Sequence, residues 1–233
     1  MKIGVPFLDE FEFPPSLVIV AEEVGAGGRE FLATSVRNVD EATYVAIAKT
    51  EEQAKRDIQL AIPEANFDFS KIRVVSLAKW YFRESVVPLK WVGEISLEML
   101  KERAGVLEKL VEVVEDAEGY IYLDSINDLA KLGRETILDV LRGLRVLCFR
   151  RNIMTFALLT LGIDASFENA VMDQGDGVIV FELEVGKERV ERWMFFRKFP
   201  SIVPRLEREG VVRYNIRLDP KSGVVVSRIM RVL

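Results

Sequence analysis

The chain has 233 residues, of which 49% are hydrophobic, and a net charge of −5. That length and apolar content suffice for a sizeable core and fit one main domain, and no apolar run approaches the roughly 18 residues of a membrane span. Histidine is absent and Cys148 is the single cysteine, which excludes histidine-activated nucleophiles, a disulfide framework and nearly all mixed-ligand zinc sites. We therefore expect a cytoplasmic protein with no membrane partner and a buried Cys148 thiol.

Strand-like and helical patterns alternate over the first 160 residues. Short apolar runs occur at residues 17–21, 44–48, 73–77, 120–124 and 153–159. Apolar residues recur with helical spacing over 31–36, 54–61, 100–114 and 137–148. Thr50 and Gln53 indicate an N-cap and capping box for the second of these helices. Strands alternating with helices predict an α/β fold whose mostly parallel sheet carries helices on both faces.

The pattern changes from Gly177 onward. Strand-like runs at residues 178–185, 189–197, 211–218 and 224–231 follow one another with only turn-like segments between them. We expect antiparallel strands that extend the same sheet, so that residues 177–233 form an extension of a single domain spanning 1–233. Residues 187–233 carry 12 Lys and Arg against 5 Asp and Glu, a charge of +7, which leaves −12 on residues 1–186.

This charge asymmetry has two interpretations. A basic surface could contact nucleic acid or an acidic partner, with Trp193 or Phe196 stacking on bases. Alternatively, the basic residues are the solvent-facing side of half-buried strands and the aromatic residues belong to the core. The candidate contact residues are Arg189, Arg192, Arg197, Lys198, Arg213 and Arg217.

The turn after the first strand has the context of a phosphate-binding loop without its chemistry. Its candidate residues are Gly25, Ala26, Gly27, Gly28, Arg29 and Glu30. A phosphate loop needs a lysine followed by a Ser or Thr for Mg²⁺, but Gly28 and Arg29 hold those positions. A shift of one residue puts Arg29 at the lysine position and Glu30 at the hydroxyl position. Glu22 and Glu23 would repel phosphate there. Either Arg29 and the helix N-terminus retain phosphate binding, or the turn is structural or an interface.

Several segments resemble the KaiC/RadA-like branch of the RecA superfamily of P-loop ATPases. The resemblance covers most of the chain and rests on residues 4–9, 16–20, 124–125 and 176–179. It implies a RecA-like fold and ATP with Mg²⁺ as ligands, and it aligns Asp124 with the family's Walker B acid. Ala48 and Lys49 stand where the family has its catalytic glutamates. Together, the missing residues of the phosphate loop and the missing glutamates imply a degenerate member of the family, of the kind found in hyperthermophilic archaea. The content of charged residues, 30%, fits such a source.

Two functions follow from these observations. The first is a non-catalytic binding or regulatory module without catalytic residues, cofactor or metal, which pairs with itself or with a RecA-family protein, including DNA-repair assemblies. The alternative is an ATP-binding protein or weak ATPase that uses Arg29 in place of lysine and Asp124 to position Mg²⁺. The aromatic segment 79–91 is either a partner-docking loop or is buried under the edge of the sheet.

Overall fold

The computed structural model describes residues 1–83, 85–94, 96, 99, 101–187 and 189–231. Within them, one sheet has the strand order β3-β2-β4-β5-β1-β6-β7-β8-β9. Its strands are β1 (Leu17–Glu22), β2 (Ala42–Ala46), β3 (Ile72–Ser76), β4 (Tyr120–Asp124), β5 (Met154–Thr160), β6 (Gly177–Val185), β7 (Val190–Lys198), β8 (Val211–Asp219) and β9 (Gly223–Arg231). Pairing is parallel from β3 to β6 and antiparallel from β6 to β9. The predicted α/β class and its antiparallel extension are confirmed.

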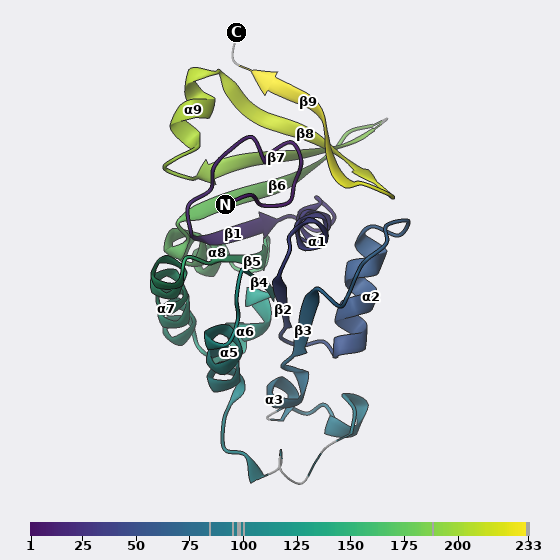
Figure 1. The fold of residues 1–233 in the computed structure, drawn as a ribbon, viewed down its shortest axis with the longest axis vertical. Coiled ribbons are helices and arrows are strands. Elements are labelled where there is room, and N and C mark those ends of the chain that lie inside the picture. The colour runs from purple at the N-terminus through teal and green to yellow at the C-terminus, as the bar shows by residue number, and fades with distance from the viewer. Residues whose placement is uncertain (84, 95, 97–98, 100, 188, 232–233) are drawn as a thin grey trace.

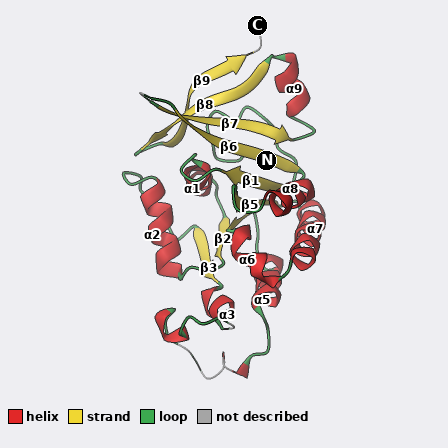
Figure 2. Cartoon of the chain, turned by 180° about the vertical axis from the view of Figure 1, so that it is seen from behind, coloured by secondary structure: helices red, strands yellow, loops and turns green. Residues whose placement is uncertain are grey.

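Helices cover both faces of the parallel part of the sheet (Figures 1 and 2). On one side lie α1 (Gly28–Asn38) and α2 (Glu51–Ala61), and on the other α5 (Val106–Glu115), α6 (Ile126–Leu129), α7 (Arg134–Arg151) and α8 (Ala165–Gln174). The remaining helices are α3 (Ala78–Phe82), α9 (Val203–Arg208) and the 3-10 turns η1 (Leu89–Trp91) and η2 (Ala130–Leu132). All six residues of β1 are buried, with alternate side chains in the two cores. This explains why the central strands are apolar throughout.

The β8–β9 hairpin, at the edge of the same sheet, contacts α1 through β9 (Figure 1). Thr34 in α1 accepts a hydrogen bond from the backbone N–H of Val224 at 3.0 Å. Arg37, one turn later, donates to the carbonyl of Lys221 at 2.8 Å. The C-terminal strands are thus fixed to the helix that follows the glycine-rich turn.

The helix predicted over residues 100–114 is interrupted, because Lys101 is helical but the residues after it are not. Leu100 lies outside the described residues, residues 102–105 are not helical, and α5 starts at Val106. Arg83 donates to the carbonyls of Glu102 and Ala104 at 2.8 and 2.6 Å. These bonds fix the non-helical residues 102–104, so the apolar spacing alone overestimated the length of the helix. The capping box of α2 and the burial of Cys148 are confirmed.

The aromatic segment 79–91 is divided between burial and exposure. Trp80, Tyr81 and Phe82 are half-buried, and the indole N–H of Trp80 donates to Glu102 at 3.1 Å. Trp91, in contrast, is 73% exposed. Among the described residues, no helix combines the length and apolar character needed to cross a membrane.

Candidate functional site

The glycine-rich turn connects the carboxyl end of β1 to the start of α1. Gly25 and Gly27 have φ values of +82° and +111°, a left-handed conformation that favours glycine. The N–H of Ala26 donates to the carbonyl of Glu23 at 2.9 Å and closes the turn. In open α/β sheets, ligands bind at the carboxyl ends of the parallel strands, so this end of the sheet is the candidate site.

The carboxylate of Glu22, the last residue of β1, lies on the N-terminus of α1. Its Oε2 accepts the backbone N–H of Arg29 at 3.2 Å and its Oε1 accepts the Arg29 Nε at 3.2 Å. The Glu22 side chain is only 4% exposed. Burial raises the pKa of Glu22, and the charge and N–H of Arg29 offset only part of that rise. The side chain therefore holds the position at which a helix N-terminus would bind an external anion.

Gly28 is closely matched to this carboxylate. A Cβ added at residue 28 would lie 2.8 Å from the Glu22 Oε2 and 2.9 Å from the Glu22 Cβ. A side chain at the lysine position of the phosphate loop thus competes with Glu22 for the same space. Glu23, which the sequence also placed at the mouth of the turn, is exposed and accepts the N–H of Leu183 at 2.8 Å.

Asp124, at the end of β4, is buried and surrounded by three donors. Its Oδ2 accepts from Lys49 Nζ at 2.6 Å and from the Tyr44 hydroxyl at 2.9 Å, and its Oδ1 lies 3.5 Å from the Arg29 Nη1. Lys49 also pairs with Asp57 at 2.8 Å. Burial, the largest single effect, lowers the pKa of Lys49 and of Arg29, but the acidic groups around them, Asp124 foremost, together outweigh it, so both pKa values are raised. Both bases are held as cations.

These contacts join five side chains into a series of alternating charge, which we term the charge network: Glu22, Arg29, Asp124, Lys49 and Asp57. The fold brings them together because β2 and β4 are neighbours, with Ala46 opposite Asp124. Lys49 follows β2 by three residues and reaches the end of β4, while Arg29 reaches the same carboxylate from α1.

The charge network does not fit Mg²⁺ with ATP as arranged. Both oxygens of Asp124 are engaged by cations, and Glu22 holds the anion position. Neither Gly28 nor Arg29 supplies the loop lysine or the Mg²⁺-binding hydroxyl. No group of three or more Asp, Glu, Cys or His side chains suited to a metal occurs among the described residues. Each charged side chain of the network is paired with another member of the network.

The C-terminal strands contact several of the remaining predicted turn residues. Ala26 is buried, and the carbonyl of Gly25 accepts the Nε of Arg192 from β7 at 2.9 Å. Gly27 lies against β8, because a Cβ there would be 3.2 Å from the side chain of Ile216. Glu30 lies within α1, where its carbonyl accepts the Thr34 hydroxyl at 2.6 Å. The C-terminal strands thus cover the turn at Ala26 and Gly27, whereas Gly25 is exposed.

The six basic residues proposed for nucleic-acid or partner contact are distributed among separate local contacts. Arg192 bonds the turn, whereas Arg197 and Lys198 lie against α8 through Met172 and the carbonyl of Asp173. The others pair with acids: Arg189 with Glu191, Arg213 with Glu184 and Arg217 with Asp219. Trp193 and Phe196 are buried, with exposed fractions of 1% and 8%, so neither side chain is available to stack on a base. Nucleic-acid binding stays a prediction.

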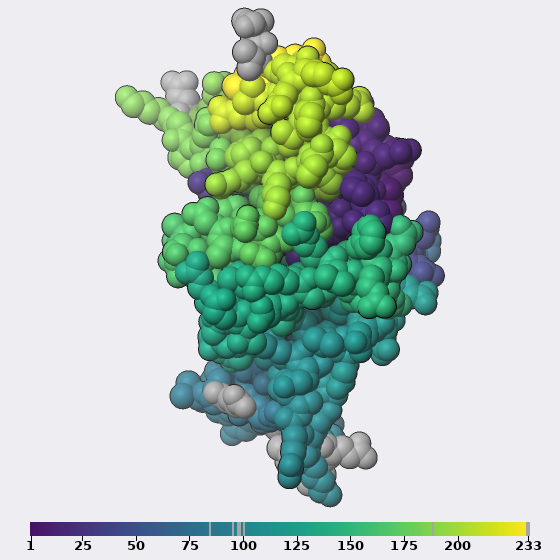
Figure 3. Space-filling view, turned by 90° about the vertical axis from the view of Figure 1, so that its left-hand side faces the viewer, coloured from purple at the N-terminus to yellow at the C-terminus, as the bar shows by residue number. Residues whose placement is uncertain are grey.

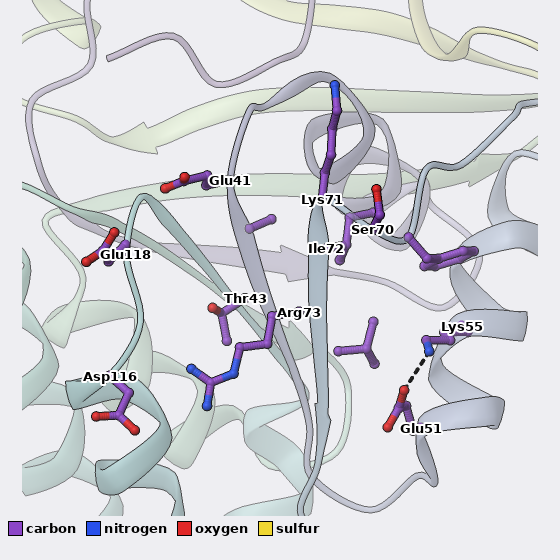
Figure 4. Close-up of a pocket in the computed structure, with 13 residues that line it drawn as sticks. Glu41, Thr43, Glu51, Lys55, Ser70, Lys71, Ile72, Arg73, Asp116 and Glu118 are labelled. Carbon is purple, nitrogen blue, oxygen red and sulfur yellow. Dashed lines mark hydrogen bonds and ion pairs between the residues drawn. The ribbon is translucent and has the colours of Figure 1, made fainter.

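A separate hollow of about 570 Å³ lies along the edge strand β3, away from the charge network (Figure 4). Its lining includes both acidic and basic side chains. Figure 4 shows Arg73 extending toward the side that carries Asp116, whereas Lys71 points away from Arg73. The hollow contains none of the predicted site residues, and we therefore assign the candidate site to the charge network.

Sequence reasoning identified Arg29 and Asp124 but not their partners. Lys49 was noted only as a departure from the family's glutamates, and Glu22 only as a charge opposing phosphate. The positions of Glu22 and Lys49 in the sequence could have identified them, because Glu22 ends β1 and Lys49 follows β2. In a parallel sheet such ends converge on one edge.

Comparison with known proteins supports the fold. No sequence family matches the chain, and no curated protein is similar to it in sequence. Among solved structures, a KaiC-like protein from the hyperthermophilic archaeon Pyrococcus horikoshii superposes with a TM-score of 0.66 over 98% of both chains. The two sequences are 20% identical. The chain has a KaiC-like, RecA-type fold, and the likeness extends to the fold alone.

Proposed function

We propose that this protein is a non-catalytic RecA-like binding module, which acts by associating with itself or with a RecA-family protein. In this proposal the charge network has replaced nucleotide chemistry. One observation carries it: the Glu22 carboxylate lies on the N-terminus of α1, bonded to the backbone N–H and the Nε of Arg29. The chain's own carboxylate is a permanent ligand in the position that a phosphate would need.

The second half of the charge network supports the same conclusion. A Mg²⁺ ion would have to displace the ammonium group of Lys49 from Asp124, where the two atoms lie 2.6 Å apart. Such charge-assisted contacts are among the strongest hydrogen bonds in proteins. Lys49 and Arg29 act here as built-in counterions for Asp124. The fold retains its surfaces for association.

Calorimetric titration with ATP and Mg²⁺ tests the loss of nucleotide chemistry. At millimolar nucleotide we expect no heat of binding and no phosphate release. A hyperbolic binding isotherm with the wild-type chain would refute the proposal and favour an ATP-binding protein that uses Arg29 and Asp124.

A pair of variants tests whether Glu22 is the blocking group. Glu22→Ala should expose the α1 N-terminus and the Arg29 guanidinium, so that inorganic pyrophosphate binds in the millimolar range. Glu23→Ala is the matched control, because Glu23 is exposed and bonds Leu183 instead. Equal pyrophosphate binding by both variants, or by neither, would contradict the assignment of Glu22.

Association is measured separately. Sedimentation at low and high salt, alone and with a RecA-family ATPase, should show self-association or a complex. A strict monomer with no affinity for such a partner would leave the module without an activity.

A further inference from the structure

Helix α7 presents an unpartnered face on the outer side of the molecule, which Figure 3 turns toward the viewer. Its buried side packs on the sheet through residues such as Ile137, Leu141 and Cys148. The opposite face carries exposed residues at successive steps of three, four, three and four: Thr136, Asp139, Gly143, Val146 and Arg150. We call these five residues the α7 seam. A repeat that averages 3.5 residues is the spacing with which two helices pack along one seam.

Two residues of the α7 seam, Asp139 and Arg150, carry opposite charges. Asp139 lies four residues before Gly143, and Arg150 lies four residues after Val146. Four residues of the seam, Asp139, Gly143, Val146 and Arg150, are therefore symmetric about the midpoint between Gly143 and Val146. Against a second copy in antiparallel orientation, each Asp139 faces the partner's Arg150, whereas a parallel orientation would place like charges together. The charge pattern selects the antiparallel arrangement.

The centre of the α7 seam is suited to close approach. Nothing lies within 4 Å of a Cβ built on Gly143, so this position is open in the single chain. Val146 is 57% exposed, and the symmetry places it opposite the partner's Gly143. Helices pack closely where a large side chain of one helix fits into the groove beside a small residue of the other.

The charged residues are available for such contacts. Asp139 is 73% exposed, and within the described part of the chain its carboxylate pairs with Arg142 on the same helix, at 2.6 Å. Arg150 is exposed and has no carboxylate partner among the described residues. Phe149, which is 81% exposed, lies beside the seam, seven residues after Arg142 on the same helix. In the antiparallel pair it lies nearly opposite the partner's Arg142, with which its ring can make a cation–π contact.

We propose that α7 is a self-association surface, which packs antiparallel on α7 of a second copy of this chain. The inference rests on the self-association named in the proposed function, and it gives that association a location and a symmetry. The contact is isologous, as in most homodimers. A single helix pair is small for an interface, so the dimer forms reversibly at micromolar or higher concentration.

Charge reversal and its rescue test the pairing. Asp139→Arg and Arg150→Asp each place like charges opposite one another twice per dimer, and each should weaken dimerisation at least about tenfold. The double variant restores opposite charges and should return the dissociation constant to within about threefold of the wild type. Sedimentation equilibrium between about 1 and 300 µM covers the expected range.

Two further variants complete the experiment. Val146→Glu places a charge at the centre of the seam and should abolish the dimer. Lys55→Glu reverses an exposed charge on α2, on the other face of the sheet, and should leave the dissociation constant unchanged. Circular dichroism and thermal melting at low concentration confirm that each variant is folded.

Two results would overturn the inference: a wild-type chain that is monomeric at 300 µM, or a dimer that tolerates Val146→Glu and shows no rescue in the double charge reversal. Neither result bears on the nucleotide titration or on binding to a RecA-family partner. The failure of the α7 surface is therefore distinguishable from the failure of the proposed function.

Discussion

Replacing Asp124 with asparagine tests the charge network most directly. Asparagine keeps the size of the side chain and can still accept the Tyr44 hydroxyl, but it removes the negative charge that holds Lys49 and Arg29. The Asp124 side chain is 2% exposed, so water cannot replace the lost interaction. Asp124→Asn should therefore destabilise the fold without enlarging a cavity.

The magnitude follows from the two broken contacts. The Lys49 contact, at 2.6 Å and mostly shielded from solvent, contributes about 2–3 kcal/mol. The Arg29 contact, at 3.5 Å and with 46% of the arginine exposed, contributes at most about 0.5 kcal/mol. The expected loss is about 3 kcal/mol, or roughly 6–12 °C in Tm for a chain of this size.

Urea unfolding at pH 7 measures this loss, with Asp57→Asn as the matched control. Asp57 is the exposed partner of the same Lys49, and its neutralisation should cost at most about 0.5 kcal/mol. The raised pKa of Lys49 fixes the pH dependence: the contribution is complete below the ordinary value of 10.5 and is lost as pH rises through the folded-state pKa. An Asp124→Asn variant that is less than 1 kcal/mol below the wild type would refute this account.

Three further outcomes follow from the structure. Because burial raises the pKa of Glu22, the folded state binds the carboxyl proton more tightly than the unfolded state does. Glu22→Gln should therefore gain stability relative to the wild type as pH rises from 4.5 through the folded-state pKa. If the unfolding free energies of the two proteins, measured in urea at pH 4–7, ran parallel, the shift would be contradicted. Gly28→Ala should cost about 1–3 kcal/mol by crowding the Glu22 carboxylate, and a double-mutant cycle with Glu22→Ala should recover most of that loss. Thr34→Val leaves the Val224 N–H without its acceptor and should cost about 1–3 kcal/mol, with faster hydrogen exchange at the start of β9; unchanged exchange there would show that α1 does not anchor the hairpin.

Most of the sheet was predictable from local pattern. Residues 120–124 were placed without error, and the other strand ends were within two residues, because apolar runs between polar turns reflect burial directly. The helix expected over residues 100–114 was wrong at residues 102–105, where Arg83, distant along the chain, bonds the carbonyls of Glu102 and Ala104. Helices α3, α6, α8 and α9 were not predicted.

The site was predictable only in part, and most of what the sequence missed depends on the order of strands in the sheet. Arg29 and Asp124 follow from motif positions, but the Lys49–Asp124 contact exists because β2 and β4 are adjacent, which local pattern does not specify. Glu22 was interpreted as a charge that repels phosphate. The structure shows that it is instead held by the helix N-terminus, because the N–H of Arg29 offsets part of its burial.

The alternating charges also constrain how this sequence can change over evolutionary time. A lysine at residue 28 meets the Glu22 side chain, and a hydroxyl residue at position 29 removes a cation from both Glu22 and Asp124. Loss of Glu22 or Lys49 alone leaves a charged neighbour with one partner fewer. A phosphate-binding loop therefore differs from this turn by several substitutions, each of which changes a contact of the charge network.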